Sequence, residues 1–408
     1  MRKRCGALYA EGTSVLEIAA ILERSRNWVY KWAERSQSDD DKWYLSQSTE
    51  PHSKPRKIAE DVERAIVHSR KFLQRRDTPA TQYAFCGAVG IHQDLDRKGI
   101  EEKPCLSTIN RVLSRNGLVD LDPKTGSQQR RIYYPAARPR HAGFIHQLDL
   151  ITPLYITGYG KISSVNRIDV FTSHANLQQY DAKNAETIIS FVIEDWKAYG
   201  IPRYLQVDNE AAFRGGLYHP RSFGKLVRFC LNFGVQMIFI PFNEPWRNGH
   251  VESLNGRFQK LVWNRYRFRN LLHLRAESEK FCEQHNTYQG YRKGHFGRLP
   301  RYGYTQAFLP ESFAFDPAQH ALPITTGLIH FVRQVDEEGS VSIFNEMFYV
   351  DKKLSYEYVW AVLNTKEQSL AFYYKATKEA EKIQVLKIDY HIREIVKNRI
   401  PINHFIKS

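Results

Sequence analysis

Cysteine is scarce in this sequence, and no two cysteines form a CxxC pair. The 408 residues hold five cysteines, which are Cys5, Cys86, Cys105, Cys230 and Cys282. Such wide spacing argues against a structural zinc site and against a disulfide framework.

Long apolar runs are absent as well. No segment approaches the roughly 18 apolar residues that a membrane helix needs, and "MRKRCGALYAEG" lacks the apolar centre of a signal peptide. These absences predict a cytoplasmic protein without a membrane partner. A glycine-rich phosphate loop is missing too, so any use of ATP would require a helper ATPase.

The charge is unbalanced in favour of basic residues. The formal net charge is +15, and Lys and Arg exceed Asp and Glu by eight in residues 1–140 and again by eight in 141–310. Such a sustained excess suits a polyanionic partner, of which nucleic acid is the simplest. On charge alone, a solvated basic surface is an equal alternative.

Residues 1–36 predict three short helices around one small core, with a capping box that begins at Ser14. Two of them are joined by a tight turn, which is typical of a helix-turn-helix whose last helix enters the DNA major groove. A small helical bundle of another kind is the alternative. The side chains then expected to face DNA are those of Arg26, Asn27, Tyr30, Lys31 and Arg35. Residues 37–56 are polar and predict a linker.

Residues 57–119 predict a second helix-turn-helix domain. Its last helix is expected to be capped by Ser107 and to stop at Gly117. The side chains expected to face DNA there are those of Thr108, Asn110, Arg111 and Arg115. The basic segment 120–140 predicts a linker that lies along phosphates.

The pattern changes from helical to mixed at residue 141. Three strand-like segments, followed by alternating helices and strands, predict a mixed sheet covered by helices in residues 141–300. After a linker at 301–325, short strands with hairpin signals predict a small antiparallel β-barrel over 326–392, and 393–408 form a tail. The fold class is therefore multidomain α+β, with amino-terminal helix-turn-helix domains, a central α/β core and a carboxy-terminal barrel.

Three acidic residues are distinguished by their context. Asp149 lies within the strand of "HQLDL", Asp208 ends the strand of "LQVDNE", and Glu252 begins the helix of "NGHVESLNG". Singly, each has a structural interpretation: a hydrogen-bonded strand aspartate, a turn aspartate and a helix-dipole partner. Carboxylates at the strand ends of one sheet can also converge, and together they would bind Mg²⁺ or Mn²⁺. Two such ions can promote phosphodiester displacement.

These three motifs, in this order and on this strand and helix pattern, resemble those of DDE-type transposases and retroviral-type integrases. The order of helix-turn-helix units, core and terminal barrel is similar to that of bacterial insertion-sequence transposases. The resemblance implies an RNase H-like core with Asp149, Asp208 and Glu252 as its metal-binding catalytic triad. It also implies double-stranded DNA as partner, both element ends and target, and strand transfer by a homo-oligomer that is nucleoid-associated when bound.

Two departures from the family pattern are visible. The segment between Asp208 and Glu252 is longer than is usual, and the extra length is expected in the loop "EAAFRGGLYHPRSFG". The amino-terminal His/Cys zinc module of retroviral integrases is missing, which favours a bacterial transposase. The alternatives are a domesticated DNA-binding regulator that has lost its chemistry, and a nuclease of the same fold that only hydrolyses.

The remaining charged residues near the three motifs are predicted to have lesser roles. The acids Glu210 and Glu244 are expected to be solvated loop residues. Arg257 and Lys260, with Arg265, Arg267 and Arg269 beyond them, form a basic stretch along and after the helix of Glu252. Beside a phosphodiester site, this stretch predicts a DNA track, with a solvated face as the alternative.

Overall fold

The computed structural model describes residues 1–46, 58–119, 132–215, 221–294 and 307–406. Parts of the expected linkers and the last two residues of the tail lie outside these ranges. The chain divides into two compact units, Met1–Ala59 and Glu60–Ser408. Among the described residues, no helix has the length and apolarity needed to cross a membrane.

The first unit is the predicted three-helix bundle. Its helices are α1 (Arg2–Ala10), α2 (Val15–Leu22) and α3 (Arg26–Ser36). The Ser14 hydroxyl accepts from the Glu17 N–H, and the Glu17 side chain accepts from the Ser14 N–H, so the predicted capping box is confirmed. Apolar side chains from all three helices close one small core, formed by Cys5, Ile18, Leu22, Val29 and Trp32.

The second unit begins with another helical group. Its helices are α4 (Glu60–Arg75), α5 (Ala88–Arg97) and α6 (Leu106–Arg115). The prediction that Ser107 caps α6 is wrong, because the helix already begins at Leu106, after Cys105. The Ser107 hydroxyl instead lies 3.1 Å from the Cys105 sulfur. Gly117 follows the helix with φ of +65°, as a helix stop requires.

This helical group packs against the rest of the second unit through the segment between α4 and α5. Tyr83 is fully buried in the same apolar cluster as Phe281 of helix α11 (Leu271–Arg292). Its hydroxyl donates to Glu277 of α11 at 2.5 Å, and the Gln82 amide donates to the same carboxylate at 2.8 Å. These contacts join the helices α4–α6 to the central sheet layer.

The centre of the second unit is a mixed sheet, as predicted. Strands β1 (Ile145–Ile156), β2 (Gly160–Asp169) and β3 (Ala175–Tyr180) pair antiparallel, and β4 (Tyr204–Val207) and β5 (Gln236–Phe239) continue from β1 in parallel. The order is β5-β4-β1-β2-β3. The helices of this part are α7 (Ala185–Tyr199), α8 (Ala211–Arg214), α9 (Lys225–Asn232), α10 (Gly249–Phe258) and α11, with a short 3₁₀ turn η1 (Pro245–Asn248) before α10 and a π-helical turn η2 (Gln259–Trp263) after it.

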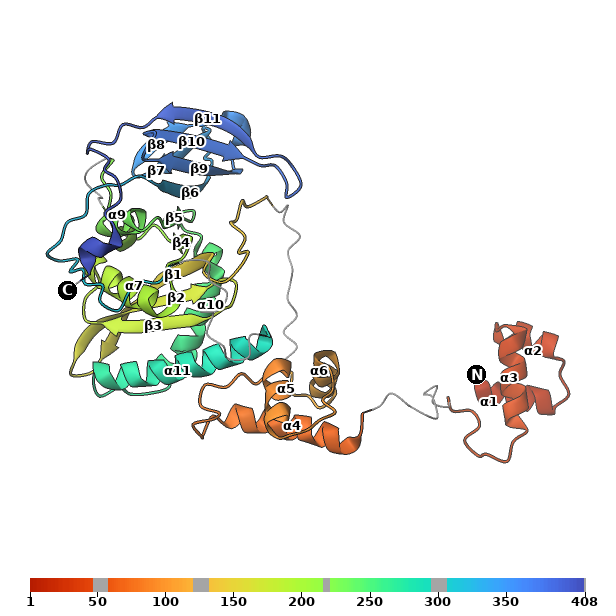
Figure 1. Cartoon of the computed structure of the whole chain (residues 1–408). Coiled ribbons are helices and arrows are strands. Elements are labelled where there is room, and N and C mark those ends of the chain that lie inside the picture. The colour runs from red at the N-terminus through yellow and green to blue at the C-terminus, as the bar shows by residue number, and fades with distance from the viewer. Residues whose placement is uncertain (47–57, 120–131, 216–220, 295–306, 407–408) are drawn as a thin grey trace. The chain divides into compact units, whose positions relative to one another are not determined.

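The two faces of this sheet bury different clusters. Side chains of α7 and α9 pack with Leu148 of β1 and Val165 of β2 on one face. Side chains of α10 and α11 pack with Ile151 of β1 and Ile162 of β2 on the other. Figure 1 shows α7 and α11 on opposite sides of the strands. Because strand residues alternate between faces, neighbouring residues of β1 point toward different helices, α7 and α9 on one face and α10 and α11 on the other.

The small antiparallel β-barrel predicted over residues 326–392 is not confirmed. Strand β6 (Leu328–Gln334) pairs in parallel with β5, so that β9 (Tyr358–Asn364), β10 (Ser369–Tyr374) and β11 (Ile383–Asp389) extend the central sheet to nine strands. Strands β7 (Ser340–Ile343) and β8 (Glu346–Tyr349) form a separate hairpin, and short 3₁₀ turns follow at η4 (Lys352–Leu354) and η5 (Ile402–Phe405). Hairpin signals predicted the strands correctly, but the partner of β6 lies about 90 residues earlier, beyond any local signal.

Candidate active site

Two glutamines fix the helix that carries Glu252 to the strands that carry the aspartates. Gln147 precedes Asp149 by two residues in β1, and its Oε1 accepts from the N–H groups of His250 and Val251 at 3.0 and 3.1 Å. These N–H groups lie in the first turn of α10, where no intrahelical acceptor exists. Gln147 therefore caps α10 from the strand.

Gln206 has the matching position in β4, two residues before Asp208. Its Nε2 donates to the Arg247 carbonyl and to Asn248 Oδ1, each at 3.1 Å. Asn248 Nδ2 in turn donates to the Leu148 carbonyl of β1 at 3.2 Å. The segments "HQLDL", "LQVDNE" and "NGHVESLNG" are thus joined by buried amide hydrogen bonds.

Asp149 is held by an asparagine of α10. Asn255 Nδ2 donates to Asp149 Oδ2 at 2.6 Å, and this side chain lies one helical turn after Glu252. Burial raises the pKa of Asp149 to about 7, and the nearby carboxylates of Glu252 and Asp208 add to the shift, against the hydrogen bond from Asn255. The charged form of Asp149 is therefore not neutralised by the protein.

The other two acids share this electrostatic environment. Burial raises the pKa of Asp208, although the Lys183 ammonium partly offsets it. Burial and then the charge of Asp208 raise the pKa of Glu252. Asp208 Oδ1 also accepts from the N–H of Glu210 at 2.9 Å, as an aspartate in a turn does. The structure thus brings the three predicted acids within electrostatic reach of one another.

The donor set at this place fits a hard divalent cation. Among the residues that the structure describes, no three ligand-type side chains already stand in a metal-holding arrangement. Yet Glu252 and Asp208 raise the pKa of Asp149, Asp208 raises that of Glu252, and Mg²⁺ or Mn²⁺ prefers oxygen ligands of this kind. A bound cation would relieve the repulsion that these raised pKa values report.

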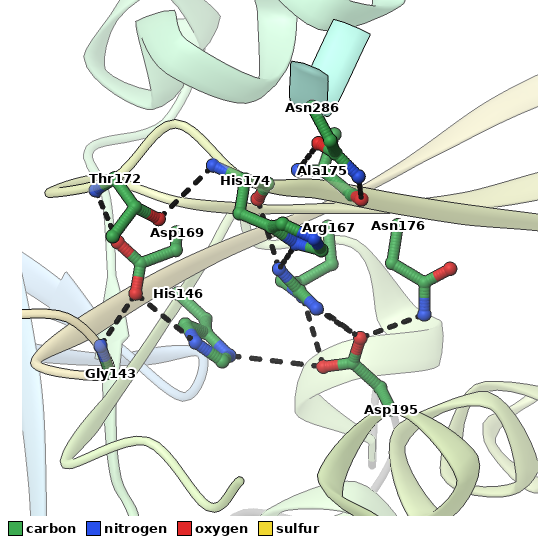
Figure 2. Close-up of polar contacts among 10 residues, drawn as sticks. All are labelled: Gly143, His146, Arg167, Asp169, Thr172, His174, Ala175, Asn176, Asp195 and Asn286. Carbon is green, nitrogen blue, oxygen red and sulfur yellow. Dashed lines mark hydrogen bonds and ion pairs between the residues drawn. The ribbon is translucent and has the colours of Figure 1, made fainter. Parts of the chain in front are cut away.

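A group of buried carboxylates lies on the opposite face of the sheet, under α7 (Figure 2). Arg167 of β2 donates to both oxygens of Asp195 of α7 from Nε at 2.9 Å, and from its terminal nitrogen at 2.5 Å. His146 of β1 lies between Asp195 and Asp169. Burial alone would raise the pKa of Asp169, but His146 and two backbone N–H groups hold it well below its usual range. Each carboxylate of this buried network thus has partners within the protein.

The prediction that Glu210 and Glu244 are solvated loop acids is wrong. Glu244 is buried, accepts from the Tyr358 hydroxyl at 2.7 Å and forms an ion pair with Arg247 at 2.7 Å. Glu210 forms an ion pair with Lys183. Except for Arg247, their partners lie far from them in sequence. Their polar sequence neighbours therefore suggested exposure to solvent, although the fold brings each of them a partner.

The predicted DNA-facing residues of the two helical groups are mostly exposed. In α3, Arg26, Asn27 and Lys31 are exposed, and so is the Tyr30 side chain, whereas Arg35 lies over the Trp32 ring at 5.0 Å. In α6, Asn110 and Arg111 are exposed, and Thr108 contacts the Cys105 sulfur at 3.3 Å. Arg115 forms an ion pair with Glu63 of α4, so its charge is already used within the helical group.

The residues of the predicted basic track along α10 are either exposed or bound to other parts of the protein. Lys260 is exposed. Arg257 instead lies over the Phe85 ring at 3.3 Å and donates to the Tyr83 carbonyl at 3.3 Å. Arg265 donates to the carbonyls of Gln82 and Arg76. These two arginines fasten the helical group α4–α6 to the core, a contact that the sequence pattern does not reveal.

Comparisons with known proteins agree with this architecture. Residues 233–289 match the family model of the integrase core domain, and residues 1–43 match the homeodomain-like domain. At the level of these families, the matches confirm the predicted resemblance to integrases and transposases. No curated protein sequence matches the chain closely enough to count as a relative.

Structural neighbours include retroviral proteins. The catalytic core domain of HTLV-2 integrase, solved with magnesium in a dimeric form, has a TM-score of 0.28 at 19% identity, over 35% of this chain and 86% of that one. An intasome of simian T-cell lymphotropic virus, in complex with the PP2A regulatory subunit B56 gamma, has a TM-score of 0.35 at 13% identity, over 78% of this chain and 100% of that one. TM-scores this low add nothing to what the domain matches show.

Gln147 and Gln206, two of the amides that build the site, were not predicted from the sequence. Each stands two residues before an acid, on the same side of the strand. A search for amides at this spacing would have found both glutamines.

Proposed function

We propose that this chain, which carries an integrase core domain and an amino-terminal homeodomain-like domain, is a DNA transposase. It binds the terminal repeats of a mobile element and catalyses metal-dependent cleavage and strand transfer. The observation that carries the proposal is the convergence of Asp149, Asp208 and Glu252, three partly buried acids from distant segments whose pKa values are all raised.

In this proposal the three acids hold two Mg²⁺ or Mn²⁺ ions. When bound, such ions supply the Lewis acidity for phosphodiester displacement. The chain's own residues orient the carboxylates: Asn255 holds one oxygen of Asp149, and Gln147 holds the first turn of the helix that presents Glu252. The exposed residues of α3 and α6 read the element ends in the major groove, as part of a homo-oligomer on DNA. An ATPase helper has no support in either domain match and is not part of the proposal.

The decisive test is Asp149→Asn in the full chain, assayed with DNA ends taken from inverted repeats that flank the gene. Cleavage and joining should fall by at least about a thousandfold, equal to ~4 kcal/mol of transition-state stabilisation, while binding to the ends persists. The change removes a charge from the site but no DNA contact. Normal strand transfer by this variant in Mg²⁺ would reject the catalytic role. Absence of any strand transfer by the wild-type protein, with end binding retained, would favour the domesticated regulator.

Sequence recognition has its own test in Arg26→Ala. A lost bidentate base contact should reduce discrimination between end and random DNA by about 1–3 kcal/mol. Lys31→Ala, one turn further along α3, is the comparison, because loss of a phosphate contact weakens all sequences alike and lowers the salt slope by about one. Equal competition by random DNA against the wild-type protein would contradict specific recognition.

A further inference from the structure

A chain of buried hydrogen bonds leads from strand β3 to Asp149. Gln179 Nε2 donates to Ser164 Oγ at 3.0 Å, and the Ser164 hydroxyl donates to Asn166 Oδ1 at 2.7 Å. Asn166 Nδ2 donates to Asn255 Oδ1 at 2.7 Å, and Asn255 Nδ2 donates to Asp149 Oδ2 at 2.6 Å. Every donor in the chain points toward the carboxylate.

The strand register holds this chain in place. Ser164 pairs directly with Gln179 between β2 and β3, and Asn166 pairs directly with Asp149 between β2 and β1. Gln179, Ser164 and Asn166 are fully buried, and Asn255 is 6% exposed. Bulk water therefore cannot replace a lost partner, and each missing link leaves a buried polar group unsatisfied.

The direction of the chain matters because each amide has one donor end and one acceptor end. The Ser164 hydroxyl donates to the Asn166 carbonyl, so the Asn166 NH₂ group faces Asn255. The Asn255 carbonyl is then occupied, and its NH₂ group faces Asp149. With the Asn255 amide reversed, its carbonyl oxygen would stand against a carboxylate oxygen, and the two acceptors would repel each other. Aligned hydrogen bonds of this kind also polarise and strengthen one another.

We propose that Gln179, Ser164 and Asn166 are positioning residues that keep the Asn255 amide turned as a donor toward Asp149. They fix one oxygen of this carboxylate and thereby hold the side chain ready for a divalent cation. The inference rests on the proposed function, because it assumes that Asp149 binds metal. It concerns residues up to four hydrogen bonds away from Asp149.

The test is Ser164→Ala in the full chain, with Mn²⁺ alone as the probe. Free Mn²⁺ is followed by its electron paramagnetic resonance signal during titration, without DNA. Binding should weaken by about tenfold, the lower end of the range for residues that support metal ligands. Gln179→Met, at the far end of the row of hydrogen bonds, should weaken Mn²⁺ binding by a smaller factor.

Ser163→Ala is the matched control. Ser163 is the neighbouring residue of β2, is also buried, and its hydroxyl donates to the Ala182 carbonyl at 2.7 Å. Ser163→Ala loses one side-chain hydrogen bond and Ser164→Ala loses two, so the melting temperature should fall in both variants, and further in Ser164→Ala. Only Ser164→Ala should lose Mn²⁺ affinity. Equal Mn²⁺ affinity in the two variants, whether retained or reduced, would overturn the inference.

The same titration separates this inference from the proposed function. Asp149→Asn should bind Mn²⁺ much more weakly than the wild-type protein. If Asp149→Asn keeps wild-type affinity, the metal site itself is wrong, and the proposed function fails with it. If Asp149→Asn loses Mn²⁺ while Ser164→Ala does not, the metal site stands and only the positioning chain is rejected.

Discussion

Two groups of carboxylates lie on opposite faces of the central sheet. Under α7, Asp169 and Asp195 are buried and have Arg167 and His146 as partners (Figure 2). Toward α10, Asp149 is only partly buried, yet it lies near two further acids, and its pKa rises to about 7. Burial alone therefore does not explain the difference. The neighbouring side chains do: the first group contacts basic side chains, whereas Asp149 has other carboxylates nearby.

Removing a charge should lower the free energy of unfolding strongly in the first group and hardly at all in the second. The largest fall is expected for Asp195→Asn. This change leaves the buried Arg167 guanidinium without its anion, so the free energy of unfolding should fall by about 3–5 kcal/mol in urea denaturation. The neighbouring exposed pair offers the control: Glu194→Gln, which breaks a contact with Lys197, should cost less than about 1 kcal/mol. By contrast, Asp149→Asn should unfold within about 1 kcal/mol of the wild-type protein. An Asp195→Asn protein as stable as the wild type would contradict the difference between the two groups.

A smaller effect should appear on acidification. The pKa of Asp169 is lower in the folded protein than the value of about 3.9 expected in the unfolded chain. Its contribution to stability is therefore complete above pH 4 and is lost as the pH falls toward the folded pKa. In this range the carboxylate of the unfolded chain is protonated before that of the folded protein, which favours unfolding. Melting temperatures measured from pH 6 to pH 2.5 should drop less steeply for Asp169→Asn than for the wild-type protein. Parallel curves would mean that Asp169 is not stabilised as a charge.

The smallest change in stability is expected for Glu252→Gln. A carboxylate in the first turn of α10 contributes about 0.3–1 kcal/mol through the helix dipole, and relief of repulsion from Asp208 works against that loss. The melting temperature should therefore hardly move, while DNA joining disappears and Mn²⁺ binding weakens. Glu283→Gln, on the exposed side of α11, is the control and should stay active. A Glu252→Gln protein that melts normally and still joins DNA ends would show that this acid is structural.

Local patterns predicted the elements of this fold well, because capping, periodicity and alternation depend on near neighbours. The capping box at Ser14 and the helix stop at Gly117 are present as expected. The three acids could also be selected as candidates from the sequence, because each is a charged residue within a strand, at a strand end or at a helix start, next to apolar residues. What the sequence could not reveal is pairing across long separations. The parallel partner of β6 and the anchoring of Arg257 on Phe85 depend on tertiary contacts that no short segment encodes.

The joining of β6 to β5 places the carboxy-terminal strands against the turn that follows Asp208. Arg333 of β6 is buried and donates to the carbonyls of Phe239 and Ile240 at the end of β5, and to Asn209 Oδ1 at 2.7 Å. Asn209 directly follows Asp208. We therefore expect a fragment cut before residue 326 to lose more than a neighbouring module: it would expose the edge of β5 and leave Asn209 without its contact to Arg333.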